Sequence, residues 1–312
     1  MSAPLVGVSN LTHHWGYVGA ICAAVLFGLG STFNKIALAH VHPLIVAGLI
    51  YFIGGVFLLL VRLSPLHSKV LALLETPTKT EPAMVGKDYI VLGLVTIAGA
   101  VTAPFLFIYG LNQTTAVNAS LLLNMESLFT VFMAFIFFEE RGVKKDYVGI
   151  LLLIVGMVFI TTKGEFQRLT LAQDVIGNIL IVLACLFWGI DNNLSKLLSK
   201  KRDLLHVVAL KCLSGGVILL FLALILGVDF KIPMLSIPYL FSVGALSIGF
   251  SIVLFVFALR EIGSIKTGVI YATSSFFGAA LAFVMLREPL TLIQLIAGLT
   301  MLLGVYILYK KP

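Results

Sequence analysis

The sequence predicts an all-α integral membrane protein in which ten transmembrane helices form two inverted five-helix repeats. Three observations predict this fold: an apolar composition, ten apolar runs of membrane-spanning length, and motifs that occur once in each half of the chain. Hydrophobic residues make up 60% of the 312 residues and charged residues 11%, whereas a soluble domain carries about a quarter charged residues. The exterior of this chain therefore suits lipid better than water.

The ten predicted spans follow one another closely. Each contains roughly 20 mostly apolar residues, the length that crosses a bilayer as a helix. The expected ranges are 15–39, 43–62, 88–111, 116–138, 146–162, 174–198, 204–227, 237–259, 265–286 and 291–309. Since most connections are short, consecutive helices are expected to be antiparallel neighbours. The long connection 63–87 contains Pro65, Pro77 and Pro82, and we expect a polar loop there.

The lysines and arginines between the spans predict the orientation. If the N-terminus is cytoplasmic, the outside connections hold only Lys163, Arg168, Lys231 and Arg287 among these residues. Cytoplasmic connections carry an excess of lysine and arginine. Both termini are therefore predicted to lie in the cytoplasm, in a multi-pass protein of the cell (plasma) membrane.

Several other classes of protein are disfavoured by the sequence. The net charge of +7 comes from short clusters between apolar runs, without a basic stripe interleaved with aromatic residues, so no nucleic-acid partner is expected. The chain has three cysteines, Cys22, Cys185 and Cys212, and no CxxC motif. This odd number and the missing motif argue against a disulfide framework or a metal site. No Walker, HExxH or GxSxG motif occurs. We therefore expect no cofactor and no enzymatic activity.

An internal repeat relates the two halves of the chain. Residues 26–35 resemble residues 187–196, so that Phe27, Gly28 and Lys35 match Trp188, Gly189 and Lys196 in turn. The acidic motif of residues 138–143 matches that of residues 286–291, which aligns Glu140 with Glu288. The halves are expected to be residues 1–168 and 169–312. Each contains five spans, an odd number, so the second half enters the membrane from the opposite side. Such inverted repeats are typical of secondary transporters.

These motifs, taken in order, resemble the ten-helix EamA-type branch of the drug/metabolite transporter superfamily over nearly the whole chain. Further marks are Met125-Glu-Ser-Leu-Phe129, with Ser127 where proline is usual, and Arg287-Glu-Pro-Leu-Thr-Leu-Ile-Gln294. The resemblance implies a central cavity lined by the first, third, fourth, sixth, eighth and ninth spans. It also implies transport of amino acids, small metabolites or amphipathic compounds.

Two acids within the spans are the leading candidates for function. Glu126 lies near the middle of the fourth span and Asp191 lies in the sixth. An ionisable side chain at mid-membrane costs on the order of 3 kcal/mol by insertion scales, so such residues usually serve a function. Glu126 is expected to contact substrate or to take up a proton. The competing interpretation for both acids is structural hydrogen bonding, worth about 1 kcal/mol per contact. Lys211, inside the seventh span, is a possible partner of Asp191.

Other polar and aromatic residues share helix faces with these acids or with one another. Helical spacing groups Asp191 with Trp188 and Asn192, and it groups Asn118 with Glu126. The full set of expected substrate contacts is Glu126, Asp191, Asn192, Asn34, Asn118, Tyr109, Trp188, Tyr271, Ser274 and Ser275. Close helix packing is the competing interpretation for the tyrosines and serines.

Four charged residues at span ends are expected to act as gates or latches: Lys35, Lys196, Glu140 and Glu288. For the two lysines the alternative is that the side chain extends to the membrane interface. For the two glutamates it is anchoring of a helix end.

The sequence thus predicts a secondary transporter or exporter that binds a small molecule midway across the bilayer and works by alternating access. Its substrates are expected to be amino acids or related amphipathic solutes, with protons as a coupling ion, and the chain is expected to act as a monomer or homodimer. A lipid or lipid-linked-sugar flippase is the alternative within transport. An intramembrane enzyme is the alternative of another class, and the missing catalytic motifs count against it.

Overall fold

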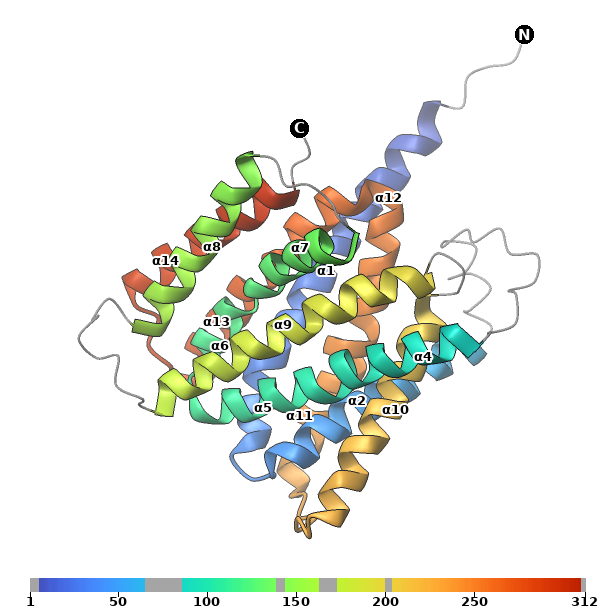
Figure 1. The fold of residues 1–312 in the computed structure, drawn as a ribbon, viewed down its shortest axis with the longest axis vertical. Helices are drawn as coiled ribbons and strands as arrows, with labels where there is room; N and C mark the ends of the chain where they lie inside the picture. The colour runs from blue at the N-terminus through green and yellow to red at the C-terminus, as the bar shows by residue number, and fades with distance from the viewer. Residues whose placement is uncertain (1–5, 65–85, 139–143, 163–172, 200–203, 310–312) are drawn as a thin grey trace.

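The computed structural model describes residues 6–64, 86–138, 144–162, 173–199 and 204–309, and all elements in these ranges are helical (Figure 1). In chain order they are α1 (Val6–Leu38), α2 (Pro43–Leu63), α4 (Gly86–Val95), the π-helical η1 (Thr96–Thr102), α5 (Ala103–Gln113), α6 (Ala116–Leu122), α7 (Met125–Phe138), α8 (Lys144–Thr162), α9 (Gln173–Ser199), α10 (Leu204–Ile225), the short 3₁₀ turn η3 (Met234–Ser236), α11 (Ile237–Ser242), the π-helical η4 (Val243–Phe250), α12 (Ser251–Ala272), α13 (Ser274–Leu286) and α14 (Leu292–Tyr309).

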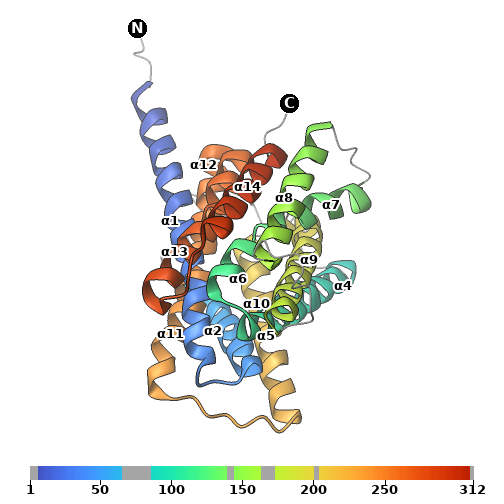
Figure 2. The same ribbon diagram turned by 90° about the vertical axis from the view of Figure 1, so that its left-hand side faces the viewer.

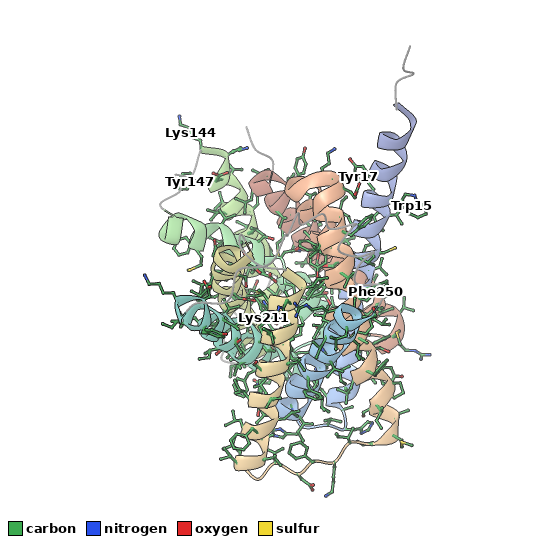
Figure 3. The ribbon with its side chains drawn as sticks, turned by 90° about the vertical axis from the view of Figure 1, so that its right-hand side faces the viewer. Trp15, Tyr17, Lys144, Tyr147, Lys211 and Phe250 are labelled. Atoms are coloured by element: carbon green, nitrogen blue, oxygen red, sulfur yellow. The ribbon has the colours of Figure 1, made fainter. Side chains whose placement is uncertain are left out.

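The predicted membrane spans are present in the described residues. Nine helical stretches there are long and apolar enough to cross a bilayer, and α14 is a shorter apolar helix at the position of the tenth expected span. Figure 3 shows Trp15, Tyr17 and Tyr147 near the end of the bundle where α1 begins, and all three side chains are exposed. Exposed tryptophan and tyrosine residues are typical of a membrane–water interface. The protein is therefore an all-α, multi-pass membrane protein.

The two halves of the chain interleave in the bundle. α2 of the first half packs against α10 of the second, and α8 packs against α14, where the two helices lie side by side (Figures 1 and 2). α1 packs against α12 and α13, while α9 packs against α5 and α7. Each half therefore depends on the other to bury its helix faces.

Two matched glycines allow close approaches between the halves. A Cβ atom on Gly28 in α1 would lie 2.7 Å from the carbonyl oxygen of Ser274 and 2.9 Å from the amide nitrogen of Gly278. A Cβ atom on Gly189 in α9 would lie 2.8 Å from the carbonyl carbon and Cβ of Phe129. Both glycines thus let one helix touch the backbone of another, as small residues do in membrane bundles. The same contact is made in each direction between the halves.

Several helices are interrupted within the bundle. The fourth expected span breaks between α6 and α7 at Leu123 and Asn124, and the ninth breaks between α12 and α13 at Thr273. The third and eighth spans contain the π-helical segments η1 and η4. Pro104, which has no amide hydrogen to donate, is the second residue of α5, just after η1. Such interruptions are tolerated in a membrane only where protein groups satisfy the backbone.

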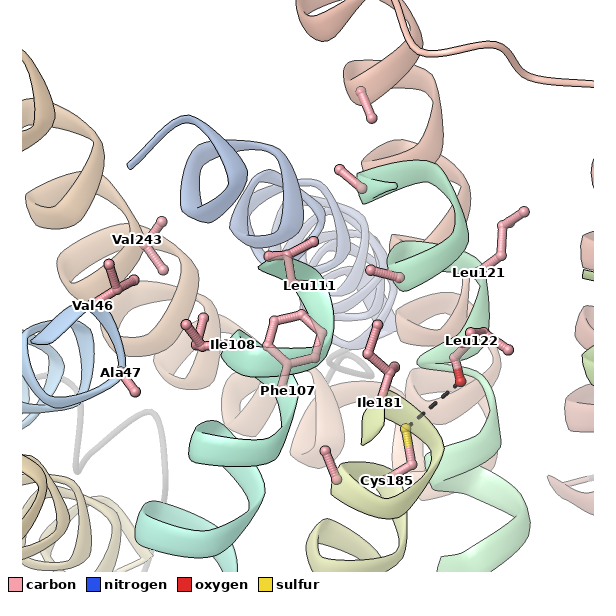
Figure 4. Close-up of a cluster of buried hydrophobic side chains, with 14 of the residues drawn as sticks. Val46, Ala47, Phe107, Ile108, Leu111, Leu121, Leu122, Ile181, Cys185 and Val243 are labelled. Carbon is pink, nitrogen blue, oxygen red and sulfur yellow. Dashed lines mark hydrogen bonds between the residues drawn. The ribbon is translucent and has the colours of Figure 1, made fainter. Parts of the chain in front are cut away.

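The apolar core lies where the halves meet. Figure 4 shows Phe107 and Ile108 of α5 close to Val46 of α2 and Val243 of η4, with Ile181 of α9 on the other side. In the same cluster, the Cys185 thiol donates to the carbonyl oxygen of Leu122 at 3.6 Å, at the end of α6 (Figure 4). This core positions the broken helices around the polar groups described below.

Gly189→Ala is expected to lower the thermal unfolding midpoint in detergent, because the added methyl group meets the backbone of Phe129. Overpacking of this kind costs about 1–3 kcal/mol. Gly93→Ala is the matched control, since a Cβ atom there meets no atom within 4 Å. Alanine is the better helix former, by about 1 kcal/mol, so this variant is expected to be as stable as the wild type or more stable. Circular dichroism melting compares the two, and equal stability of both variants would contradict the close contact.

Candidate functional site

A buried ion pair lies at the centre of the bundle. Lys211 Nζ of α10 donates to Asp191 Oδ2 of α9 at 2.6 Å, and Ser195 Oγ donates to Asp191 Oδ1 at 2.9 Å. Figure 3 shows Lys211 midway along the bundle, whereas Lys144 extends from its end. The predicted pairing of Lys211 with Asp191 is confirmed. Each charge compensates the other, which makes burial of both tolerable in a membrane.

Gly99 of η1 packs directly on this ion pair. A Cβ atom at Gly99 would overlap the carboxylate of Asp191. The absence of a side chain at this one position therefore gives Asp191 the space in which it meets Lys211.

Glu126 of α7 contacts Asn192 of α9, the residue that follows Asp191. Its Oε1 accepts a hydrogen bond from Asn192 Nδ2 at 2.8 Å, and the same amide group donates to Thr130 Oγ1 at 3.2 Å. The break before α7 places Glu126 in the first turn of that helix, where the helix dipole favours a negative charge. Within the part of the chain that the structure describes, Glu126 has no cationic partner in contact. Its charge is therefore not cancelled by an ion pair, although Asp191 and Lys211 are within Coulombic reach.

A cavity lies next to these charges, between the two halves. Its volume is ≈ 50 Å³. Its walls come from α1, α2, α5, α9, η4 and the break after α6. The lining residues are Phe27, Gly30, Ser31, Asn34, Ile50, Tyr51, Pro104, Phe107, Leu123, Trp188, Val243, Ser247 and Ile248. Aromatic residues and a few polar groups thus share one small chamber.

The matched aromatic residues Phe27 and Trp188 both line this cavity, and each is held in place. Trp188 Nε1 donates to the carbonyl oxygen of Gly99 at 3.1 Å and to Tyr51 Oη at 3.2 Å. The ring of Phe27 lies 5.1 Å from that of Tyr271. Both rings are therefore fixed walls of the chamber.

Asn34, Asn118 and Tyr109 have three different environments. Asn34 lines the cavity. Asn118 accepts a hydrogen bond from Gln294 Nε2 at 2.7 Å, in a buried network away from the cavity lining. The ring of Tyr109 stacks at 4.5 Å on Phe105 and is not part of the lining either. Asn118 does not share a continuous face with Glu126 because the helix breaks between them.

The expected contacts of α12 and α13 lie at their junction. Ser275 Oγ accepts from Asn124 Nδ2 at 3.0 Å and donates to the carbonyl oxygen of Ala272 at 2.9 Å. Ser274 is buried, and its carbonyl group faces Gly28. Ser275 thus links the break in α12–α13 to the break in α6–α7.

Lys35 and Glu288 converge on the connection between α5 and α6 from opposite halves of the chain. Lys35 Nζ donates to the carbonyl oxygens of Leu111 at 2.7 Å and Thr114 at 2.6 Å, at the end of α5. The carboxylate of Glu288 accepts from the amides of Ala116 at 3.0 Å and Val117 at 2.9 Å, at the start of α6. A cation at a helix C-terminus and an anion at an N-terminus both match the helix dipole. We call this group of contacts the α5–α6 clamp.

The structure gives no contacts for the other two gate candidates. Glu140 and the side chain of Lys196 lie outside the described residues.

Sequence reasoning missed several residues of the site. They are Tyr51, Thr130, Gly99 and Ser247. Tyr51 accepts a hydrogen bond from Trp188, and Thr130 accepts one from Asn192. Gly99 leaves space for Asp191, and Ser247 lines the cavity. Thr130 lies four residues after Glu126, so its position on the same helix face was a usable signal. Tyr51 also carried a signal, as a polar aromatic residue in the middle of an apolar span.

The fold and the site define a class of protein before any relative is considered: a polytopic helical membrane protein with an aromatic-walled cavity between its two halves and a buried ion pair in its interior. A model of the EamA-like transporter family matches residues 14–162 and again residues 175–310. The chain belongs to this family. It is therefore a transporter, whose partners are the lipid bilayer and a small-molecule substrate.

Individual relatives agree with this assignment. A protein of Methanothermobacter thermautotrophicus named "Uncharacterized transporter" is 42% identical over 295 residues, covering 95% of this chain and 86% of the relative. The "Uncharacterized transporter YoaV" of Bacillus subtilis is 25% identical over 310 residues, covering 97% of this chain and 95% of the relative. One solved crystal structure covers 96% of both chains with a TM-score of 0.65 at 16% identity, which supports the fold alone.

Asp191→Asn and Lys211→Met are each expected to destabilise the protein by about 3 kcal/mol, since each leaves one buried charge without its partner. The double variant Asp191→Asn/Lys211→Met is expected to recover most of the loss, because it removes both charges. Thermal unfolding in detergent measures all three variants. A double variant as unstable as the sum of the two single variants would show that the ion pair is not the relevant contact.

Proposed function

We propose that this protein is a secondary transporter that exports amino acids or related amphipathic solutes by alternating access. The observation that carries the proposal is the position of Glu126, a carboxylate without an ion-pair partner among the described residues, beside a chamber that both halves of the chain enclose. Aromatic walls suit the apolar part of a solute, and the uncompensated acid suits a positively charged group or a proton.

Alternating access follows if the halves, residues 1–168 and 169–312, are inverted repeats. The reciprocal contacts of Gly28 and Gly189 support this relation, since each touches the matching helix of the other half. So does the presence of a π-helical segment in both the third and the eighth span. Two similar units in opposite orientation can exchange conformations and so open the chamber to one side of the membrane and then the other.

The orientation is part of the proposal. We place the protein in the plasma membrane with both termini in the cytoplasm. The α5–α6 clamp then faces the outside, and the first turn of α7 lies in the inner half of the membrane. The excess of lysine and arginine on the inside connections supports this arrangement.

A thermal-shift screen of amino acids, amines and other small metabolites against the purified protein tests the proposal directly. A stabilising solute is then loaded into proteoliposomes for counterflow. Saturable exchange of that solute supports a carrier, whereas unsaturable flux would indicate a channel and would contradict alternating access.

Glu126→Gln is expected to abolish uptake driven by a pH gradient, while counterflow without a gradient persists. The reason is that glutamine keeps the hydrogen bond with Asn192 but takes up no proton. Proteoliposome uptake at imposed pH gradients measures the effect, and a loss of tenfold or more is expected. Asp229→Asn is the control, because Asp229 is exposed and pairs with Lys231 at 2.5 Å in a connection between spans. Gradient-driven uptake that is equal in both variants would remove proton coupling.

The α5–α6 clamp is proposed to latch the outer side of the chamber. Glu288→Gln or Lys35→Met is expected to weaken it by about 1 kcal/mol, which shifts the open population roughly fivefold. In a chain whose native cysteines are replaced by alanine, Ser31→Cys reports opening through its reaction with a membrane-impermeant maleimide. Faster labelling in the clamp variants than in Asp229→Asn supports the latch. Unchanged labelling would leave Lys35 and Glu288 as structural helix caps.

A further inference from the structure

The chamber combines aromatic walls with an absence of charged wall residues. The rings of Phe27, Tyr51, Phe107 and Trp188 line it, and none of its lining residues is lysine, arginine, aspartate or glutamate. Aromatic faces carry negative potential and attract cations. This lining therefore favours a positively charged or neutral group over an anion.

Two donors in the chamber wall are already used, and one buried acceptor is not. Trp188 Nε1 already donates to Gly99 and Tyr51, and Ser247 Oγ donates to the carbonyl oxygen of Phe27 at 3.1 Å. Asn34 is only 2% exposed, and its Oδ1 has no hydrogen-bond partner. A buried acceptor without a donor is costly and rare in native structures. A ligand that brings an N–H group into the chamber satisfies it.

One of the buried carboxylates near the chamber has no ion-pair partner among the described residues. Lys211 and Asp191 cancel one another at 2.6 Å, and Glu126 has only neutral hydrogen-bond partners in the described part of the chain. At the Lys35 end, the ammonium group is already bound to helix-end carbonyl oxygens. A ligand carboxylate would thus find no cation among the residues that line the chamber.

We infer that the chamber binds the ammonium group of a small organic amine with an aromatic or alkyl tail, and that Asn34 Oδ1 accepts a hydrogen bond from that group. This inference rests on the proposed transport function and narrows it. Among the related amphipathic solutes it selects those that lack the carboxylate of an amino acid. In this arrangement the ammonium group occupies the ≈ 50 Å³ of the cavity, while the tail lies along the aromatic walls.

Matched pairs of solutes test the choice of substrate class. Phenethylamine and phenylalanine differ only by a carboxylate, as do tryptamine and tryptophan. Thermal shift and proteoliposome counterflow are measured for each pair on the full chain. The amines are expected to bind at least tenfold more tightly than the matching amino acids and to exchange in a saturable manner.

Variants of Asn34 test the position of the ammonium group. Asn34→Ala is expected to weaken amine binding at least fivefold, whereas Asn34→Asp keeps an acceptor and adds a negative charge, so it is expected to retain or tighten binding. Asn178→Ala is the matched control. Asn178 is also fully buried and also has an unpartnered side-chain atom, its Nδ2, but it does not line the chamber. Melting curves of each variant confirm that it folds.

The outcomes separate the inference from the proposed function. Amino acids that exchange as well as the amines, or better, overturn the inference and leave transport by this chain intact. Equal losses in Asn34→Ala and Asn178→Ala overturn the assignment of Asn34. If no solute of these pairs or of the wider metabolite screen shows saturable exchange, the inference and the proposed function both fail.

Discussion

A helix that is interrupted inside a bilayer exposes backbone groups that no water can satisfy, and this constraint governs the whole architecture. At the α5–α6 connection the exposed carbonyl oxygens are bound by Lys35 and the exposed amides by Glu288. The breaks at α6–α7 and α12–α13 are joined through Asn124 and Ser275. The backbone groups of the α5–α6 connection are thus satisfied by residues distant in sequence, and the other two breaks are joined by a side-chain hydrogen bond between residues far apart in the chain. The interruptions in turn create the site, because the break before α7 gives Glu126 a helix N-terminus.

The polar groups near the chamber differ in how fully they are satisfied. Asp191 has Lys211 and Ser195, and Trp188 has two acceptors for its single N–H group. Glu126, in contrast, has neutral partners for a charge. Buried groups that the protein itself satisfies hold the structure together, whereas groups that it leaves incompletely satisfied are available to a ligand. The ion pair is therefore a structural contact of the protein interior, whereas Glu126 is available to a ligand.

The sequence predicts the membrane class and the spans well, because an apolar run of roughly 20 residues has few other stable structures. It also predicts the Lys211–Asp191 pair, since two opposite charges deep in spans need one another. The helix breaks escape such reasoning. Ser127 stands where proline is usual in the family, yet the fourth span breaks nearby, and the ninth span breaks beside Ser275, also without a proline. The helical spacing that grouped Asn118 with Glu126 fails for the same reason. The role of Gly99 is visible only in three dimensions, since its neighbour Asp191 lies far along the chain.

The two π-helical segments allow residues of the third and eighth spans to shift along the helix. A π turn holds one residue more than an α turn. If that extra residue migrates along the helix, each residue it passes turns by about 100° and advances about 1.5 Å. The ends of the helix stay where they are. η1 carries Gly99 beside Asp191, and η4 carries Ser247 in the chamber wall. A screw-like shift of this kind would turn wall residues into or out of the chamber without moving a whole helix through the lipid.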